Sequence, residues 1–194
     1  MKRRQRPPEQ LSWVRVPDEA ELPEEVRSLF ARAREKLGFV PNVLRVWSLR
    51  PVHMLLWRRY MDELIKGDSG LTEAQREMIG AVVSATNRCH YCITSHGAAV
   101  RVLTGDPILG DQLVSNYRHA AISAKERAML DYAVKITEES HRCSEEDIDA
   151  LRKAGWSDED VMDIAEVAAM FNLTNRLASA LGWLPNEEYH RAGR

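Results

Sequence analysis

The stretch from Glu77 to His96 reads EMIGAVVSATNRCHYCITSH, and it holds both a helical pattern and the most reactive side chains of the chain. Apolar residues of its first part fall on one side of a helix: Met78, Ile79, Val82 and Val83. Just upstream, Thr72 with Gln75 three residues later forms a capping box, which predicts where this helix begins. The stretch therefore predicts one amphipathic helix followed directly by a second that carries the cysteines.

The same kind of helix punctuation recurs on both sides of this stretch. Helical segments are predicted at 24–36, 42–47, 51–64, 73–83, about 88–103, 124–136, 145–151 and about 161–181. Ser123 with Glu126 forms a second capping box, and Gly38 and Gly155 are typical helix stops. Clear period-2 strand runs are missing. The predicted fold class is all-α, a compact helical bundle.

Apolar positions are dense in the last long helix, from Val161 to Leu173. Such a wide apolar surface is typical of a helix that is buried on more than one side, as at a subunit interface. Trp47 and Trp57 suggest self-association as well if they are exposed, although both could equally be core anchors. We therefore expect a homo-oligomer, whose subunit number this pattern does not give.

Composition and charge exclude several classes of protein. With 194 residues, 44% hydrophobic and 29% charged, the chain is ordinary for a globular protein and not for a disordered one. Its 27 Lys and Arg against 29 Asp and Glu give a net charge of −2, which favours neither nucleic acid nor an anionic membrane as a partner. Three cysteines are too few for a secreted disulfide framework. Because neither a secretory signal nor a membrane span is found, we expect a soluble protein in a reducing, cytoplasmic setting.

Cys89 and Cys92 form a Cys-x-x-Cys pair, and His96 follows four residues later. Residues three and four apart on a helix share a face, with Cβ atoms about 5–6 Å apart, so these side chains are predicted to line one stripe. The thiolate is the reactive form, and an ordinary thiol with a pKa of ~8.5 is mostly protonated at pH 7. Asn87 as an N-cap and Arg88 as a nearby cation would lower that pKa. His96 would accept the proton of Cys92.

The spacing of the pair also fits dithiol chemistry. A disulfide between residues this close would be strained, easily reduced, and catalytic rather than structural. One cysteine would attack, and the other would resolve the oxidised product before it reaches an irreversible state. Two alternatives stay open: a zinc site, for which Cys143 near His141 is the other ligand candidate, and an inert core position for both cysteines. Haem attachment is excluded, because Ile93 and not histidine follows the second cysteine.

Glu77 lies in the helix before the cysteines, and taken alone it is most simply a solvated surface residue. Together with Cys89-x-Tyr91-Cys92 and His96, and with Val83-Ser84-x-x-Asn87 between, it closely resembles the alkylhydroperoxidase D/carboxymuconolactone decarboxylase superfamily, and within it the peroxidase-related branch. The resemblance covers residues 20–186 and includes further matching segments: Leu37-Gly38-Phe39-Val40-Pro41-Asn42-Val43, Thr104-Gly105-Asp106-Pro107, Val167-Ala168-Ala169-Met170-Phe171-Asn172 and Asn175-Arg176.

The resemblance implies an all-helical fold that assembles as trimers or as hexamers of dimers, and a hydroperoxide-reducing dithiol centre. By position, Cys92 is the attacking thiol and Cys89 the resolving thiol, while His96 and Glu77 match the family's proton relay, which works through water. Better-studied members carry a histidine immediately before the second cysteine, where this chain has Tyr91. Tyrosine, with a pKa near ~10, only donates or passes a proton through its hydroxyl, so the relay is expected to differ here.

The function expected from these residues is thiol-dependent reduction of hydroperoxides in antioxidant defence. The resemblance implies no bound cofactor and an external dithiol, of the lipoyl type or similar, or a partner reductase as electron donor. The alternatives are a redox sensor or stress-response module that uses the same pair without turnover, and a metal-binding protein. Lactone decarboxylation is not expected, because the decarboxylase branch lacks the cysteine pair.

The predicted organisation is one helical domain at 20–186 between tails at 1–19 and 187–194. Within the domain we expect an N-terminal helical arm at 20–66, the catalytic helices at 70–120 and the C-terminal helices at 123–186.

Overall fold

The computed structural model describes residues 10–194; residues 1–9, which belong to the tail expected at 1–19, lie outside the described part. The helices are α1 (Glu24–Leu37), α2 (Asn42–Trp47), α3 (Pro51–Lys66), α4 (Glu73–Thr86), α5 (His90–Thr104), α6 (Leu109–Asn116), α7 (Ala124–Glu139), α8 (Glu145–Lys153) and α9 (Asp158–Ala180). Short 3-10 turns are η1 (Glu19–Glu21), η2 (Tyr117–His119), η3 (Ser140–Arg142) and η4 (Glu187–His190). No strand occurs in the described residues, which confirms the all-α prediction.

Local capping fixes where several helices begin and end. At the start of α4 the backbone N–H of Gln75 donates to Oγ1 of Thr72, and the N–H of Thr72 donates to Oε1 of Gln75. The same reciprocal pair joins Ser123 and Glu126 at the start of α7, so both predicted capping boxes are confirmed. Gly38 ends α1 in the left-handed conformation, with φ +82°, as its position as a helix stop predicts.

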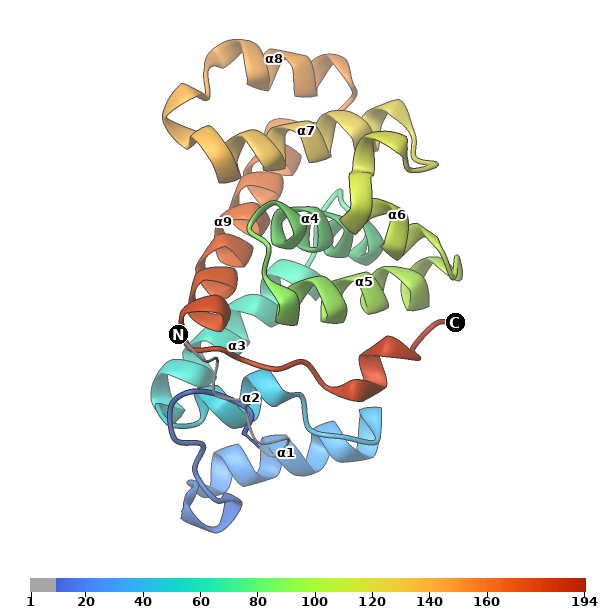
Figure 1. The fold of residues 1–194 in the computed structure, drawn as a ribbon. Coiled ribbons are helices and arrows are strands. Elements are labelled where there is room, and N and C mark those ends of the chain that lie inside the picture. Colours follow the sequence, from blue (N-terminus) through green and yellow to red (C-terminus); the bar gives the residue numbers. More distant parts are fainter. Residues whose placement is uncertain (1–9) are drawn as a thin grey trace, which may run out of the picture.

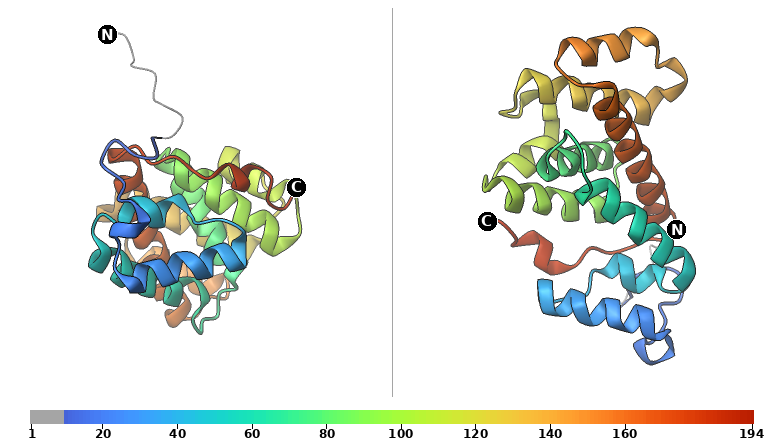
Figure 2. Two further views of the ribbon diagram at one scale, coloured as in Figure 1. Left: turned by 90° about the horizontal axis from the view of Figure 1, so that it is seen from below. Right: turned by 180° about the vertical axis from the view of Figure 1, so that it is seen from behind.

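The centre of the bundle is α4, which packs against α5, α6, α7 and α9 (Figure 1). Its Gly80 lies directly under the ring of Phe171 from α9, and a Cβ at that position would come within 2.6 Å of the ring. Only glycine allows this approach, so α9 packs closely against α4, the helix that ends just before Cys89. The long helix α9 runs along the whole bundle, from α8 at one end to α3 at the other (Figures 1 and 2).

The N-terminal helices form a layer of their own below α5. Their core is a separate apolar cluster of six buried residues: Leu22, Val26, Phe30, Val40, Leu44 and Met54. Trp47 and Trp57 stack on each other with ring centroids 4.5 Å apart and pack against this layer, so they are core anchors. Because α9 also buries most of its apolar residues inside the chain, neither feature calls for a subunit interface, and the homo-oligomer stays a prediction.

The C-terminal segment that follows α9 passes between the N-terminal layer and α5 (Figure 1), and the N-terminal segment meets it just after α9. They pair with each other: the N–H of Trp13 donates to the carbonyl of Leu181 at 2.9 Å, and the N–H of Leu184 donates to that of Leu11 at 3.1 Å. The segment 187–194, expected as a tail, contains η4 and lies against α5, where Arg101 hydrogen-bonds its backbone.

None of the helices in residues 10–194 has the combination of length and apolar character that crossing a bilayer requires.

Candidate active site

The turn between α4 and α5 places the first cysteine. The N–H of Cys89 donates to the carbonyl of Ser84 at 2.9 Å, and the N–H of Arg88 donates to that of Ala85 at 3.0 Å, which together form a Schellman motif. Arg88 occupies its left-handed position with φ +55°, where glycine is usual, and no other non-glycine residue among 10–194 has a positive φ. This turn ends α4 and leaves Cys89 as the N-cap of α5.

The prediction that Asn87 is the N-cap of the cysteine helix is therefore wrong, and the helix begins two residues after the predicted start near Arg88. Asn87 still has helical backbone angles, φ −78° and ψ −4°, and is the C-cap of α4. An N-cap requires an extended backbone, which Cys89 adopts instead. Cys89 thus lies just outside α5, whereas Cys92 lies in its first turn.

The two cysteines are neighbours and both are free thiols. Their exposed fractions are only 1% and 2%, and they lie in one apolar cluster with Tyr91, Trp183 and, from the N-terminal segment, Val14. The prediction that both cysteines lie in the first turns of one helix holds for Cys92, whereas Cys89 is the N-cap of that helix. The burial means that a reagent reaches the sulfurs only through small openings or when the covering segments move.

One negative charge is shared unequally by the pair. The pKa of Cys89 is lowered to about 6, chiefly because the Cys92 thiol donates a hydrogen bond to its sulfur; the Cys92 backbone N–H, the Ser179 hydroxyl and the charge of His96 add to this effect. The pKa of Cys92 is raised well above its ordinary value by that same neighbour and by burial. Arg88 has an exposed side chain and is not among the main groups that act on either pKa. These interactions favour a thiolate on Cys89 over one on Cys92.

Glu77 and His96 meet between α4 and α5. Oε2 of Glu77 lies 2.6 Å from Nδ1 of His96, and the two side chains are 12% and 18% exposed. The ring edge of His96 also contacts Phe171, with centroids 4.4 Å apart. The sequence pattern alone placed Glu77 on the solvated surface, but the structure buries it against the histidine that the resemblance pairs with it.

Tyr91 is 4% exposed, and its hydroxyl accepts a hydrogen bond from the N–H of Val43 at 3.1 Å. Burial raises the pKa of Tyr91 well above its ordinary value, so its hydroxyl stays protonated. Its neighbour is Tyr189 of η4, a residue that sequence reasoning missed because it lies in the expected tail. Burial likewise raises the pKa of Tyr189 to about 12. A lone aromatic between polar residues was the sole signal that this segment packs.

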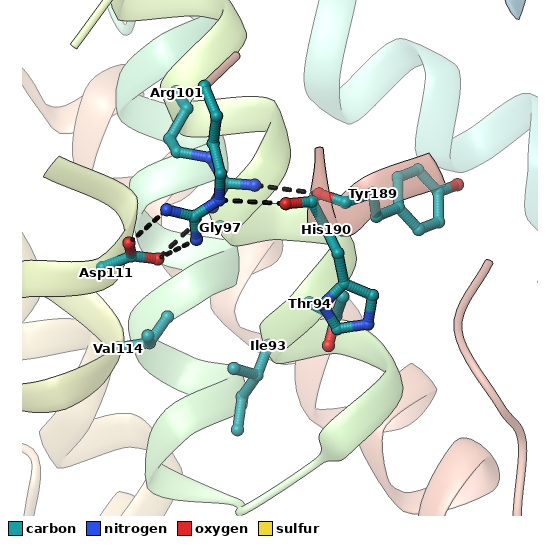
Figure 3. Close-up of a pocket in the computed structure, with 9 residues that line it drawn as sticks. Ile93, Thr94, Gly97, Arg101, Asp111, Val114, Tyr189 and His190 are labelled. Atoms are coloured by element: carbon teal, nitrogen blue, oxygen red, sulfur yellow. Dashed lines mark hydrogen bonds and ion pairs between the residues drawn. The ribbon is translucent and has the colours of Figure 1, made fainter. Parts of the chain in front are cut away.

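A hollow of about 130 Å³ lies on the outer side of α5, where Arg101 holds the C-terminal segment (Figure 3). The Arg101 guanidinium donates to the carbonyls of Tyr189, at 2.8 Å, and Ala192, at 3.0 Å, and forms an ion pair with Asp111. The ring of Tyr189 points away from this cluster. Because its donors are taken by protein groups, Arg101 is an anchor for the segment that covers the cysteines.

Cys143 lies before α8, which leads into the start of α9, whereas Cys89 lies near Ser179 at the end of α9. The structure therefore does not bring the third cysteine and its neighbour His141 to the pair. Within residues 10–194 no three side chains of His, Cys, Asp or Glu gather as they would around a metal ion.

The chain matches proteins of one family in both sequence and structure. Residues 51–104 match the model of the carboxymuconolactone decarboxylase family. An uncharacterised peroxidase-related protein of Ralstonia eutropha JMP134, described as an alkylhydroperoxidase AhpD core, is 42% identical, with 95% of this chain and 97% of that chain covered and a TM-score of 0.93. An uncharacterised peroxidase-related protein of Silicibacter sp. TM1040 is 44% identical, with 96% and 98% covered and a TM-score of 0.92.

The debrominase Bmp8, solved as a Cys-to-Ala variant in complex with 2,3,4-tribromopyrrole, shares the fold with a TM-score of 0.72 over 91% of this chain and 93% of its own, at 16% identity. Among curated proteins, none matches the chain. The high identity over nearly the whole of two chains confirms the resemblance found in the sequence. The chain belongs to the alkylhydroperoxidase D-like/carboxymuconolactone decarboxylase superfamily.

Proposed function

We propose that the protein reduces hydroperoxides with the thiols of Cys89 and Cys92 and so serves in antioxidant defence. The observation that carries this proposal is the thiol pair at the start of α5, in which the pKa of one member lies near 6. A pair of this kind holds a reactive thiolate at neutral pH and has a second thiol in contact to complete a disulfide. The peroxidase-related relatives support the same chemistry.

In the proposed reaction, the thiolate of Cys92 attacks the terminal peroxide oxygen, the O–O bond breaks, and the leaving oxygen takes a proton to give an alcohol or water. Cys92 becomes a sulfenic acid. The sulfur of Cys89 then attacks the sulfur of that sulfenic acid, releasing water and forming a disulfide. An external dithiol returns the pair to two thiols by exchange, giving up two electrons and two protons.

The resting charge on Cys89 means that the pair must shift a proton before Cys92 attacks. The proton that Cys92 donates toward Cys89 can stay there, which leaves the charge on Cys92. We assign the proton for the leaving oxygen to His96: Glu77 engages its Nδ1, so Nε2 is the nitrogen that exchanges protons with water or substrate. Tyr91, held by Val43, keeps its hydroxyl proton and is assigned to passing protons rather than to ionising.

Two serine variants test the proposal directly. Cys92→Ser should abolish peroxide consumption in the presence of dithiothreitol, whereas Cys89→Ser should react once and then be over-oxidised. Mass spectrometry of the Cys89–Cys92 peptide before and after one equivalent of peroxide should show the loss of two hydrogen atoms in the wild type. Sustained turnover by Cys92→Ser would refute the assignment of Cys92 as the attacking thiol. The absence of turnover in the wild type would refute the proposal that the protein is a peroxidase.

The burial of both sulfurs favours a second candidate function, a redox sensor. A sensor would be oxidised once by peroxide and change its assembly or surface, without sustained flux to a dithiol. Stoichiometric formation of the disulfide, with no further peroxide consumed when dithiothreitol is present in excess, would support the sensor over the peroxidase.

A further inference from the structure

Two short polar motifs that are almost ninety residues apart in sequence meet beside Cys92. Ser84 and Asn87 come from the end of α4, and Asn172 and Asn175 come from the second half of α9. Ser84 is 0% exposed and Asn175 is 1% exposed, so both are polar groups in the interior. Burying them without partners would be costly, and each is satisfied by the others in a continuous chain of hydrogen bonds.

The outer end of this chain fixes its direction. The amide nitrogen of Asn172 donates to Oγ1 of Thr137 and to the carbonyl of Ala168, both at 3.0 Å. Its Oδ1 is therefore the acceptor, and it receives a hydrogen bond from the exposed guanidinium of Arg176 at 2.5 Å and one from Nδ2 of Asn87 at 2.9 Å. A guanidinium has donors only, so Arg176 sets the orientation of the first amide.

Each following amide is oriented by the one before it. Nδ2 of Asn87 also donates to Oδ1 of Asn175 at 3.0 Å, which turns Nδ2 of Asn175 toward Oγ of Ser84, at 3.0 Å. The Ser84 oxygen thus accepts a hydrogen bond, and its own proton is left to donate. This series of hydrogen bonds therefore orients each amide in turn, from the guanidinium of Arg176 at the surface to the Ser84 hydroxyl in the core.

Cys92 is the group at the inner end. The backbone carbonyl of Ser84 also accepts a hydrogen bond from the N–H of Cys89, so Ser84 is held to the turn that precedes α5. Hydrogen bonds from Asn175 and Ser84 both lower the pKa of Cys92, against the effects of Cys89 and burial. They are the groups that favour a thiolate on Cys92 rather than on its neighbour.

We propose that Ser84 and Asn175 are positioning residues for Cys92. The series of hydrogen bonds that begins at Arg176 directs the Ser84 hydroxyl proton at the sulfur of Cys92 and stabilises the anionic form of that sulfur. This role rests on the proposed function, in which Cys92 must carry the charge to attack a peroxide. The same donors would hold the oxygen of the sulfenic acid until Cys89 attacks the sulfur of Cys92 and that oxygen leaves as water.

The test measures Cys92 alone, in a Cys89→Ser background. The rate at which iodoacetamide modifies the Cys92 peptide is followed against pH by mass spectrometry. Adding Ser84→Ala should move the profile to higher pH and slow the reaction at pH 7 about tenfold, the size expected for the loss of one hydrogen bond to a charged group. Ser48→Ala, a buried serine that donates only to the carbonyl of Arg45, is the matched control and should leave the profile unchanged.

Asn175→Asp keeps the shape of the side chain but accepts where the amide donates, so it should draw the Ser84 proton away from Cys92 and move the profile further in the same direction. Arg176→Met acts from the exposed end, where folding is not at risk, and should give a smaller shift of the same sign. An unchanged profile in folded Ser84→Ala or Arg176→Met protein, or an equal shift in Ser48→Ala, would overturn the proposal. Because alkylation needs no peroxide, this result is independent of whether the wild type turns peroxide over.

Discussion

Nδ1 of His96 lies 2.6 Å from Oε2 of Glu77, and this short contact joins α5 to α4 beside the cysteine pair. Both side chains are largely shielded from water, which strengthens the interaction between a carboxylate and an imidazole. Because the carboxylate holds one ring nitrogen, it fixes which nitrogen of His96 is free, and it stabilises the imidazolium if the ring takes up a proton. Glu77 therefore orients the histidine of the proposed relay.

Glu77→Gln keeps the shape of this side chain and removes its charge. We expect peroxide turnover to fall about 10²-fold, the lower end of what general acid–base catalysis contributes, because a neutral amide stabilises the imidazolium poorly. Peroxide consumption with dithiothreitol as donor is the measurement. Glu73→Gln, in the exposed first turn of the same helix, is the matched control and should keep wild-type turnover. Wild-type turnover in Glu77→Gln would remove this residue from the relay.

The reactivity of Cys89 should follow its lowered pKa. The thiol form dominates below pH 6 and the thiolate above it, so alkylation of Cys89 by iodoacetamide should rise with pH through about 6 and level off by about pH 8. The pKa of Cys143 is raised by burial, so the same protein contains a control that stays slow over this range. Peptide mass spectrometry separates the two sites.

Removing the Cys92 thiol should shift the Cys89 profile to higher pH, because that thiol is the largest cause of the lowered pKa. Cys92→Ser keeps a hydroxyl donor in its place, whereas Cys92→Ala removes the donor, so the shift should be larger in Cys92→Ala. A midpoint near the ordinary ~8.5 in the wild type would show that the resting thiolate does not lie on Cys89.

Local signals in the sequence predicted much of the fold. The capping boxes at Thr72 and Ser123 act within one turn, and so they are readable without knowledge of the rest of the chain. Helix α6 was missed because Gly110 interrupts its pattern; in the structure a Cβ there would lie 2.3 Å from the carbonyl of Gly97, so the glycine serves close helix packing. Gly110 reads as a helix breaker in the sequence, whereas in the fold it allows two helices to pack closely.

The sequence motif names Glu77, the two cysteines and His96 as candidates, but it gives neither their arrangement nor the contribution of Tyr189. Asn87 suits an N-cap as well as a C-cap, and the choice depends on the left-handed backbone of Arg88, which no local rule requires. The bonds from Asn87 to Asn172 and Asn175 span 85 and 88 residues, and the contact of Tyr189 with Tyr91 spans a similar distance. Helical periodicity carries no information about such pairings.

Arg101 should control access to the cysteines. Arg101→Met keeps most of the side chain's apolar bulk but leaves the carbonyls of Tyr189 and Ala192 without their donor. We expect the free energy of unfolding to fall by roughly 2–4 kcal/mol, because two carbonyls lose their donor at about 1–3 kcal/mol each, and both are only partly buried, which keeps the loss below the upper limit. Hydrogen exchange in residues 183–192 and alkylation of Cys89 at pH 8 should both become faster.

Arg194→Met is the control for that substitution, because Arg194 pairs with the same Asp111 from an exposed position. It should leave alkylation of the pair nearly unchanged. If Arg101→Met loosens residues 183–192 without exposing the cysteines, the C-terminal segment is not their cover.

Arg88→Gly separates the backbone role of Arg88 from its charge. A left-handed backbone costs a residue with a Cβ about 1–2 kcal/mol, and glycine adopts it without that cost. Because glycine also gains freedom in the unfolded chain, we expect the free energy of unfolding in urea to rise by only about 0.5–1 kcal/mol. The Schellman turn and the position of Cys89 should be kept, so the alkylation profile of Cys89 should not move. A profile shifted to higher pH would instead show that the arginine charge, although exposed, stabilises the thiolate.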